Sequence, residues 1–321
     1  MIELYPAIDL LGGEVVRLRQ GDYADRTVYG ADPVATAMSF VESGATWVHV
    51  VDLDAARTGS PVNRPVVAAI AAATHGAASV QTGGGVRSVA DAEALAVAGV
   101  SRVVMGSAAV AEPSLVAAAS SVVPVAVGLD HRSGEVAVHG WTEGSGVALA
   151  DALGWFPTAA AFVITDIARD GMLTGPEVQG LAAAAAATNI PVIASGGVSS
   201  IADLVALCAV PGVAGIITGK AIYEGRFTVA EGLAAIAAAR TPPLARLIFA
   251  LGIRNVGEAT ARDLARHFRS MQALAEADEP ALQQVPDVGP VVAASIRSFF
   301  DHPDQAQVVS ALSAEIRTPR L

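Results

Sequence analysis

Residues 192–220 read VIASGGVSSIADLVALCAVPGVAGIITGK and contain one complete copy of the pattern that decides the fold. A short β-branched run, Val192–Ala194, leads into the turn Ser195-Gly196-Gly197 and then into a helical stretch rich in Ala and Leu. A second run, Gly215–Thr218, ends in Gly219-Lys220. Short apolar runs joined by a helical segment are typical of parallel strands with a crossover helix. We therefore expect a βα unit here.

The same alternation extends outward over residues 1 to about 240, where eight such units occur. The other expected strands are Ile2–Ile8, Trp47–Val51, Ser79–Thr82, Arg102–Met105, Val125–Leu129 and Phe162–Thr165. Strict alternation predicts an α/β fold with a parallel sheet, and eight units can close into a (β/α)8 TIM barrel. No GxGxxG follows the first strand, which weighs against a Rossmann fold.

The two halves of this region resemble each other. Four short motifs recur in the same order at nearly constant spacing, and together they indicate a two-fold half-barrel repeat. They are Pro6-Ala7-Ile8-Asp9 with Val127-Gly128-Leu129-Asp130, Val51-Asp52-Leu53 with Thr165-Asp166-Ile167, Gly84-Gly85-Val86 with Gly196-Gly197-Val198, and Gly106-Ser107 with Gly219-Lys220.

The pattern changes after residue 240. Thr241-Pro242-Pro243 interrupts the last barrel helix, and no strand-like run follows. We therefore expect two domains, a barrel over residues 1–240 and a small all-α domain over residues 241–321. The second contains two hairpin-like turns, Leu251–Gly257 and Val285–Pro290, each followed by a helical stretch.

Composition limits the classes of protein that this chain can be. A content of 53% hydrophobic and 16% charged residues suits a large core of buried strands, and the net charge of −11 argues against a whole protein held on DNA or on an anionic membrane. The single cysteine, Cys208, favours a reducing compartment. The N-terminus has no signal-peptide pattern, and no apolar run is long enough to span a bilayer. We expect a cytoplasmic monomer.

Two aspartates follow opposite strands of the predicted barrel. Catalytic groups in such barrels lie at the carboxyl ends of the strands, and Asp9 and Asp130 occupy that position on the first and fifth strands. A lone aspartate there is more often a helix cap, but a symmetric pair facing across the barrel can supply one base and one acid.

Glycine-rich turns follow the third, fourth, seventh and eighth strands. Their exposed backbone N–H groups can cradle phosphate, although a single Gly-Gly turn would be explained by tight geometry alone. The site after the last two strands is the usual phosphate site of these barrels, and its repetition predicts a second one opposite. We therefore expect a small substrate with two phosphates.

At this point the chain resembles the phosphoribosylformimino-aminoimidazole-carboxamide ribotide isomerases of histidine biosynthesis, including the actinobacterial form that also isomerises phosphoribosylanthranilate. The resemblance covers residues 1 to about 240. The motifs that carry it are Pro6–Asp9, Val16–Leu18, Gln20–Tyr23, Val51–Asp54, Gly84–Arg87, Gly140-Trp141, Thr165–Gly171 and the two glycine turns of the second half.

The resemblance implies an Amadori rearrangement of an aminoaldose to a ketose, without metal or redox cofactor. It implies Asp9 as the proton acceptor, Asp130 as the proton donor and Asp170 as a supporting or alternative acid. The resemblance also implies that Trp141 belongs to a loop that closes over the substrate. We expect Arg17 in a loop after the first strand, where its guanidinium could bind a phosphate or carboxylate bidentately. The substrate- and phosphate-binding residues that we expect are Arg17, Gly84, Gly85, Arg87, Gly106, Ser107, His139, Trp141, Gly196, Gly197, Gly219 and Lys220.

Three alternatives remain open. The dual-specificity pattern has Arg two residues before the Trp, where this chain has His139, so the activity in tryptophan synthesis depends on that position. The related cyclase shares the repeat and the paired aspartates but fits Val16–Leu18 and Gly140-Trp141 less well. The C-terminal turns resemble the helix-hairpin-helix region of NAD-dependent DNA ligases, so the chain could instead be a DNA-associated protein that binds through residues 244–300. The net charge of −1 over residues 241–321 fits a packing or dimerisation module equally well.

Overall fold

The computed structural model describes residues 2–239 and 243–315. The chain divides into two compact units between Ile236 and Ala237, and each is treated by itself. The predicted domain boundary, between residues 240 and 241, lies outside the described residues.

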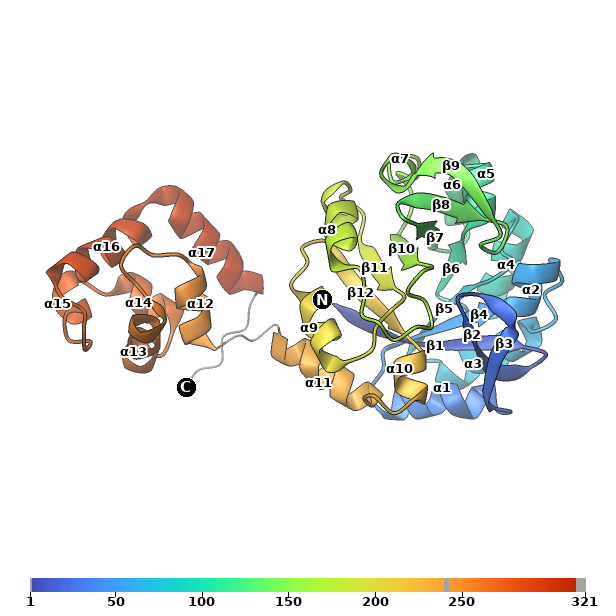
Figure 1. Ribbon diagram of the computed structural model, residues 1–321, viewed down its shortest axis with the longest axis horizontal. Helices are drawn as coiled ribbons and strands as arrows, with labels where there is room; N and C mark the ends of the chain where they lie inside the picture. Colours follow the sequence, from blue (N-terminus) through green and yellow to red (C-terminus); the bar gives the residue numbers. More distant parts are fainter. Residues whose placement is uncertain (1, 240–242, 316–321) are drawn as a thin grey trace. The chain divides into compact units, whose positions relative to one another are not determined.

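Eight parallel strands form the predicted closed barrel in the first unit (Figure 1). The strands are β1 (Glu3–Leu11), β4 (Trp47–Asp52), β5 (Ser79–Gly83), β6 (Arg102–Met105), β7 (Val125–Arg132), β10 (Ala161–Asp166), β11 (Val192–Ser195) and β12 (Val213–Thr218). β12 pairs with β1 and β10 pairs with β7, so every barrel strand has a neighbour on both sides. The order follows the sequence, as expected for consecutive βα units.

Helices surround the barrel and bury one apolar face each. Their bounds are α1 (Pro33–Glu42), α2 (Leu53–Thr58), α3 (Arg64–Thr74), α4 (Val89–Val97), α5 (Ser107–Ala111), α6 (Ser114–Ser120), α7 (Leu149–Ala152), α8 (Val178–Ala186), α9 (Ile201–Cys208), α10 (Lys220–Tyr223) and α11 (Val229–Ala239). In α3, Val67, Ile70 and Ala71 are buried, at the spacing that places side chains on one side of a helix. Ser88 and Ser200 cap α4 and α9 at equivalent places in the two halves.

Each half also carries an antiparallel hairpin that was not predicted. β2 (Glu14–Arg19) and β3 (Asp22–Gly30) continue from β1, and β8 (Glu135–Val138) and β9 (Glu143–Ala148) continue from β7. Because the hairpins pair with the ends of β1 and β7, these strands run past the predicted ends. Asp9 and Asp130 therefore lie within strands rather than after them, and Arg17 lies on β2 rather than in a loop.

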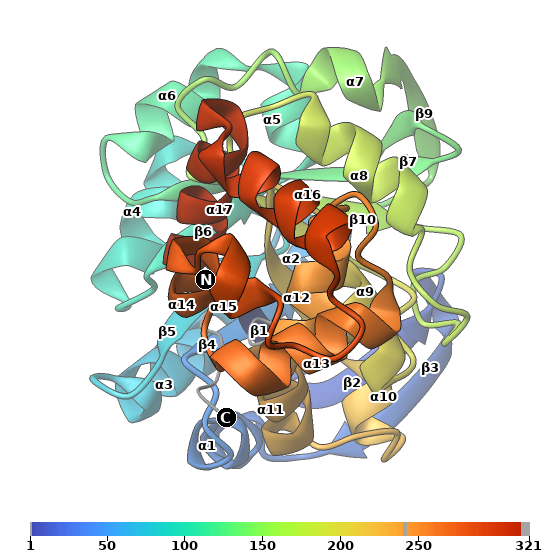
Figure 2. The same ribbon diagram turned by 90° about the vertical axis from the view of Figure 1, so that its left-hand side faces the viewer.

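The second unit has only helices among its described residues (Figure 2). They are α12 (Leu244–Ala250), α13 (Glu258–Phe268), α14 (Met271–Glu276), α15 (Glu279–Leu282), α16 (Pro290–Asp301) and α17 (Pro303–Glu315). Their apolar faces share one core, which includes Leu247 and Ile248 of α12 and Ile296 of α16. No single helix in the described part of the chain is long and apolar enough to cross a membrane, although the bent pair α11 and α12 reaches that length and composition.

Candidate active site

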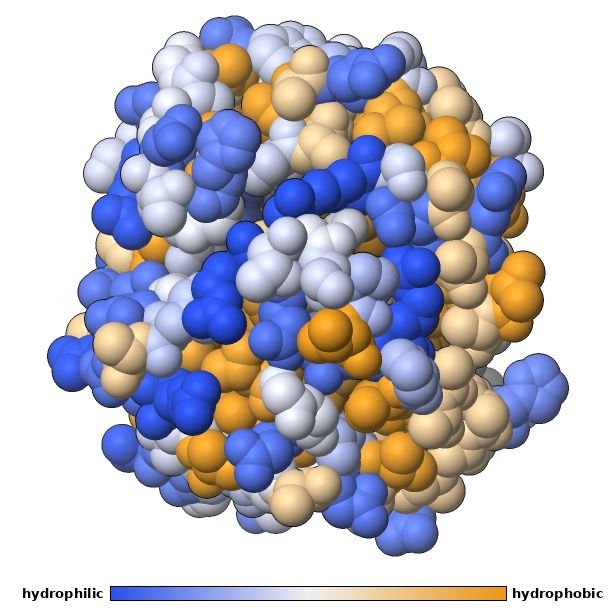
Figure 3. All heavy atoms as spheres, turned by 90° about the vertical axis from the view of Figure 1, so that its right-hand side faces the viewer, coloured by the Kyte–Doolittle hydropathy of each residue, from blue (hydrophilic) through white to orange (hydrophobic). Residues whose placement is uncertain are grey.

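The carboxyl ends of the barrel strands and the two hairpins form one face of the first unit, here called the mouth, on which hydrophilic residues gather near the middle (Figure 3). Asp9 and Arg17 form an ion pair there, with 3.0 Å between Asp9 Oδ1 and Arg17 Nη1. Both side chains are nearly buried, at 13% and 10% exposure. Burial raises the pKa of Asp9, and the guanidinium of Arg17 opposes that rise. The pair joins the first barrel strand to its hairpin.

Asp130 has a different partner from Asp9. Trp141, in the turn between β8 and β9, donates a hydrogen bond from Nε1 to Asp130 Oδ2 at 2.7 Å. Burial raises the pKa of Asp130, while hydrogen bonds from Trp141 and Thr165 lower it. The ring of Trp141 lies against Gly21 in the turn between β2 and β3. One side chain therefore contacts both Asp130 and the opposite hairpin.

Asp170 lies in the loop after β10, close enough to Asp9 and Asp130 for both carboxylates to act on it. Burial is the largest cause of the rise in the pKa of Asp170 to about 6, and the two carboxylates add to it. Arg17 and the backbone N–H of Gly171 act in the opposite direction. The mouth thus brings together three carboxyl groups with raised pKa values.

The glycine turns of the second half line one pocket together with Arg17 and Asp170. Its walls contain two buried polar atoms without a hydrogen-bond partner, Arg17 Nε and Thr218 Oγ1. Buried polar groups normally have partners, so this pocket suits a polar ligand. The predicted residues Gly196, Gly197, Gly219 and Lys220 all line it.

Close backbone approach explains part of this glycine pattern. A side chain at Gly197 would collide with the carbonyl oxygen of Gly175, and one at Gly219 with the guanidinium of Arg17. Lys220 donates a hydrogen bond from Nζ to the carbonyl oxygen of Gly171 at 2.9 Å. The turn after β12 is thereby tied to the loop that carries Asp170.

In the first half, the equivalent turns follow the neighbouring strands β5 and β6. Gly84 and Gly85 approach the backbone of Asp52 and Ala55, at places equivalent to those of Gly196 and Gly197. Ser107 is the first residue after Gly106, and its Oγ accepts a hydrogen bond from the backbone N–H of His139 at 2.9 Å. This side of the mouth is therefore joined to the hairpin that carries Trp141.

The structure does not direct two of the predicted residues into the mouth. The guanidinium of Arg87 donates to the carbonyl oxygen of Ala56 at 2.9 Å and lies beside Gly59. The side chain of His139 is 67% exposed and lies 3.9 Å from Glu143. Both residues are exposed.

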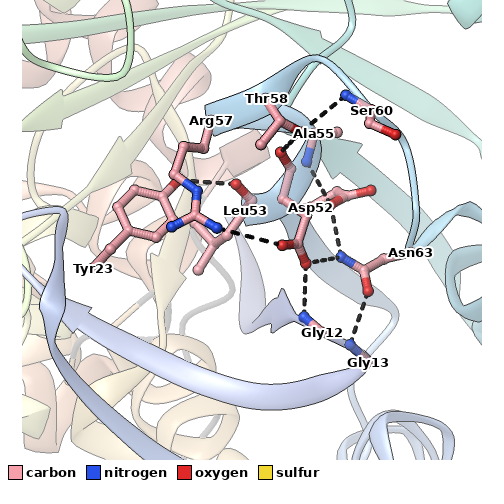
Figure 4. A network of polar contacts seen from close by, with 11 residues as sticks. Gly12, Gly13, Tyr23, Asp52, Leu53, Ala55, Arg57, Thr58, Ser60 and Asn63 are labelled. Atoms are coloured by element: carbon pink, nitrogen blue, oxygen red, sulfur yellow. Dashed lines mark hydrogen bonds and ion pairs between the residues drawn. The ribbon is translucent and has the colours of Figure 1, made fainter.

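Sequence reasoning missed Asn63, which organises the base of the first hairpin (Figure 4). Its side chain is buried, accepts from the N–H of Gly13 at 2.9 Å and donates to Asp52 and Asp54 at 2.7 and 2.9 Å. Asp54 in turn accepts from the N–H of Gly12. These bonds fix the turn between β1 and β2, and so help to position Arg17. A lone Asn in a helix-flanking turn gives no local signal of this role.

Comparison with known proteins agrees with this geometry. Residues 3–228 match the family described as histidine biosynthesis protein, and residues 246–309 match the helix-hairpin-helix motif. Three relatives carry the name 1-(5-phosphoribosyl)-5-((5-phosphoribosylamino)methylideneamino) imidazole-4-carboxamide isomerase.

The relative from Synechococcus sp. is 48% identical over 246 residues, covering 74% of this chain and 95% of the relative. The relative from Rhizorhabdus wittichii is 48% identical, covering 72% and 97%, and the one from Paracoccus denitrificans is 47% identical, covering 73% and 99%. The chain therefore belongs to the histidine biosynthesis protein family, to which its barrel is matched almost from end to end.

Proposed function

We propose that this chain is the aminoaldose–ketose isomerase of histidine biosynthesis, converting the phosphoribosylamino form of the imidazole carboxamide ribotide to its ribulosyl form. The observation that carries the proposal is the cluster of Asp9, Asp130 and Asp170 at one end of the barrel. Each has a raised pKa, and each has different partners. Isomerisation needs one group that takes a proton from carbon and another that gives a proton to oxygen, so carboxyl groups in distinct environments suit it.

The partners support a division of roles. Arg17 favours the ionised form of Asp9, which suits a proton acceptor at C2′. Asp130 is held by Trp141 of the closing hairpin, so a proton donated there is shielded from water once the substrate is bound. Asp170, with a pKa of about 6, is partly protonated near neutral pH and supports either step.

We assign the two phosphates of the substrate to the two halves of the barrel. One phosphate site lies at the glycine turns of the second half. It is supported by the pocket there, in which Arg17 Nε and Thr218 Oγ1 are buried without hydrogen-bond partners. The symmetric backbone of Gly84, Gly85, Gly106 and Ser107 supports the other. No step of this chemistry requires a redox cofactor or a metal. The catalytic domain is residues 1–240, and we propose that it acts as a monomer in the cytoplasm.

Turnover of the histidine-pathway aminoaldose by the purified chain tests the proposal, with Asp9→Asn and Asp130→Asn beside the wild type. We expect wild-type turnover and a loss of at least about 100-fold in kcat for each variant, since each removes a proton-transfer group. Asp151→Asn, an exposed aspartate on α7, is the matched control and keeps wild-type turnover. A folded wild type that does not turn over this substrate would refute the proposal.

His139 decides the expectation for phosphoribosylanthranilate. The exposed imidazole lies 3.9 Å from Glu143, and an imidazole lacks the planar fork of donors with which a guanidinium binds a carboxylate bidentately at that position of the dual-specificity pattern. We expect weak or no turnover of this second substrate and a gain of activity in His139→Arg. Efficient turnover by the wild type would contradict this reasoning.

For the C-terminal domain, residues 241–321, we propose that any nucleic-acid contact is made by the first hairpin alone. Residues 243–270 contain five Arg and two acidic residues, whereas residues 271–301 contain one Arg and five acidic residues. That one cation, Arg297, is bound to the carbonyl oxygens of Ala275 and Ala277 and to Asp301. An electrophoretic mobility shift of DNA by the wild type in low salt that the Arg254→Gln substitution weakens would support this contact. Absence of a shift with both the wild type and the variant would refute it.

A further inference from the structure

A column of polar and aromatic side chains fills the lower half of the barrel interior, below the mouth. It consists of Tyr5, Trp47, His49, Gln81 and Arg102, from β1, β4, β5 and β6. The guanidinium of Arg102 lies 4.4 Å from the ring centre of Trp47 and donates from Nη2 to the hydroxyl of Tyr5 at 2.8 Å. No carboxylate pairs with Arg102 among the described residues, so π faces and neutral oxygens hold this cation.

The direction of the hydrogen bonds in this column is fixed by Arg102, because a guanidinium only donates. Its Nε donates to Gln81 Oε1 at 2.5 Å, so the amide nitrogen of Gln81 is the atom that faces His49 Nδ1 at 2.9 Å. An amide nitrogen also only donates, so His49 Nδ1 must accept. The neutral imidazole therefore carries its proton on Nε2.

The register of the sheet places His49 directly below the mouth. His49 lies beside Ala7 of β1, and Asp9 is two residues further along that strand, on the same side of the sheet. Within the described ranges, no acceptor lies within hydrogen-bond distance of His49 Nε2. This atom is nevertheless not among the fully buried polar atoms that lack a partner, so it is not fully buried. Gln81 and Arg102 occupy the Nδ1 side of the ring, and Asp9 lies further up the barrel, so the direction that remains for this N–H is towards the mouth.

We propose that Arg102 and Gln81 lock His49 as a neutral imidazole with its proton on Nε2, and that this N–H donates a hydrogen bond to an oxygen of the ring-opened sugar phosphate. The donor role rests on the proposed isomerase function, whereas the tautomer does not. Arg102 and Gln81 act as positioning residues. Their effect is to supply a donor below Asp9 without adding a positive charge there.

The surroundings explain why a neutral donor is needed. An imidazolium at this place would lie near the guanidiniums of both Arg17 and Arg102, and a proton on Nδ1 would face the amide N–H of Gln81. Burial and then the two guanidiniums lower the pKa of His49 to about 3. The column thus keeps the imidazole of His49 in its neutral form.

Histidine ring ¹⁵N NMR on the full-length chain tests the tautomer directly, with His49→Gln used to assign the signals. For the wild type we expect a proton on Nε2 and no titration between about pH 5 and 9. In Gln81→Glu, a carboxylate accepts from both Arg102 and His49, so the proton moves to Nδ1 or the ring titrates in this range. A wild-type His49 protonated on Nδ1, or titrating near its ordinary pKa, would overturn the proposal.

Turnover tests the donor role. His49→Leu removes the N–H and should lower kcat by about 100-fold, the effect of deleting one donor to developing charge, whereas His49→Gln keeps a donor and should recover most of the loss. His75→Leu, at an exposed position, is the control and leaves kcat unchanged. Wild-type kcat in His49→Leu would overturn the donor role. If the wild type itself is inactive, the isomerase function fails and the NMR result still decides the tautomer.

Discussion

Replacing Trp141 by Phe isolates one hydrogen bond at the proposed catalytic acid. The indole Nε1 donates to Asp130 Oδ2 at 2.7 Å, and the ring packs against Gly21. Phenylalanine keeps an aromatic ring of similar shape and loses the donor. The variant therefore tests the effect of the N–H on the carboxyl group with the least change in packing.

The expected size follows from the geometry. A hydrogen bond to a charged group contributes about 1.5–3 kcal/mol, and one pKa unit corresponds to about 1.4 kcal/mol. Loss of the bond should therefore raise the pKa of Asp130 by about 1–2 units, in the same direction as the burial that already raises it. An acid must be protonated to act, so the basic limb of the pH profile of kcat/KM should move to higher pH by the same amount.

The assay measures kcat/KM for the histidine-pathway substrate over about pH 5–10. KM is determined separately, because a change in how the active site closes over the substrate would alter KM. Trp155→Phe is the matched control, since Trp155 is 39% exposed and its described contact is with the ring of Phe156. The control should keep the wild-type profile. A basic limb in Trp141→Phe that stays in place, or moves to lower pH, would refute Asp130 as the acid that this bond regulates.

Three further predictions concern stability and ligand binding. Burial raises the pKa of Asp170 to about 6, so ionisation of this carboxyl lowers the stability of the fold. This destabilisation is absent near pH 4, grows as the pH rises and reaches its full size above about pH 6.5. Asp170→Asn should then raise the free energy of unfolding in urea by up to about 3 kcal/mol at pH 8 and by little at pH 4, and equal effects at both pH values would contradict this. Asn63→Leu leaves buried groups of the first hairpin without partners and should cost about 3 kcal/mol in the same assay, whereas a loss below about 1 kcal/mol would show that the hairpin does not depend on it. Gly197→Ala combines a positive φ with a backbone collision and should lower Tm and raise KM, while Gly225→Ala, with a positive φ but open space, should lower Tm only slightly; equal effects of the two would mean that close approach is unimportant.

Much of the barrel was predictable because its signals are local. The eight β-branched runs, the glycine turns and the repeated motifs each occupy a few consecutive residues. All eight barrel strands overlap their predicted ranges, and β1 and β7 continue past the predicted ends. The hairpins were missed because β3, with the sequence DYADRTVYG, is mostly exposed and has no alternating apolar pattern. That omission is the reason why Arg17 was expected in a loop.

The sequence by itself determined that Asp9 and Asp130 occupy equivalent places in a repeated fold, since repetition and strand-end position are properties of short motifs. Only the tertiary structure decided their partners: Arg17 for one and Trp141 for the other. It also decided that Arg87 turns towards Ala56, and that Asn63 and His49 bond to residues 50 and 32 positions away in the chain. The physical reason is that a hydrogen bond or a pKa depends on what surrounds a group after folding, and those surroundings come from several strands at once.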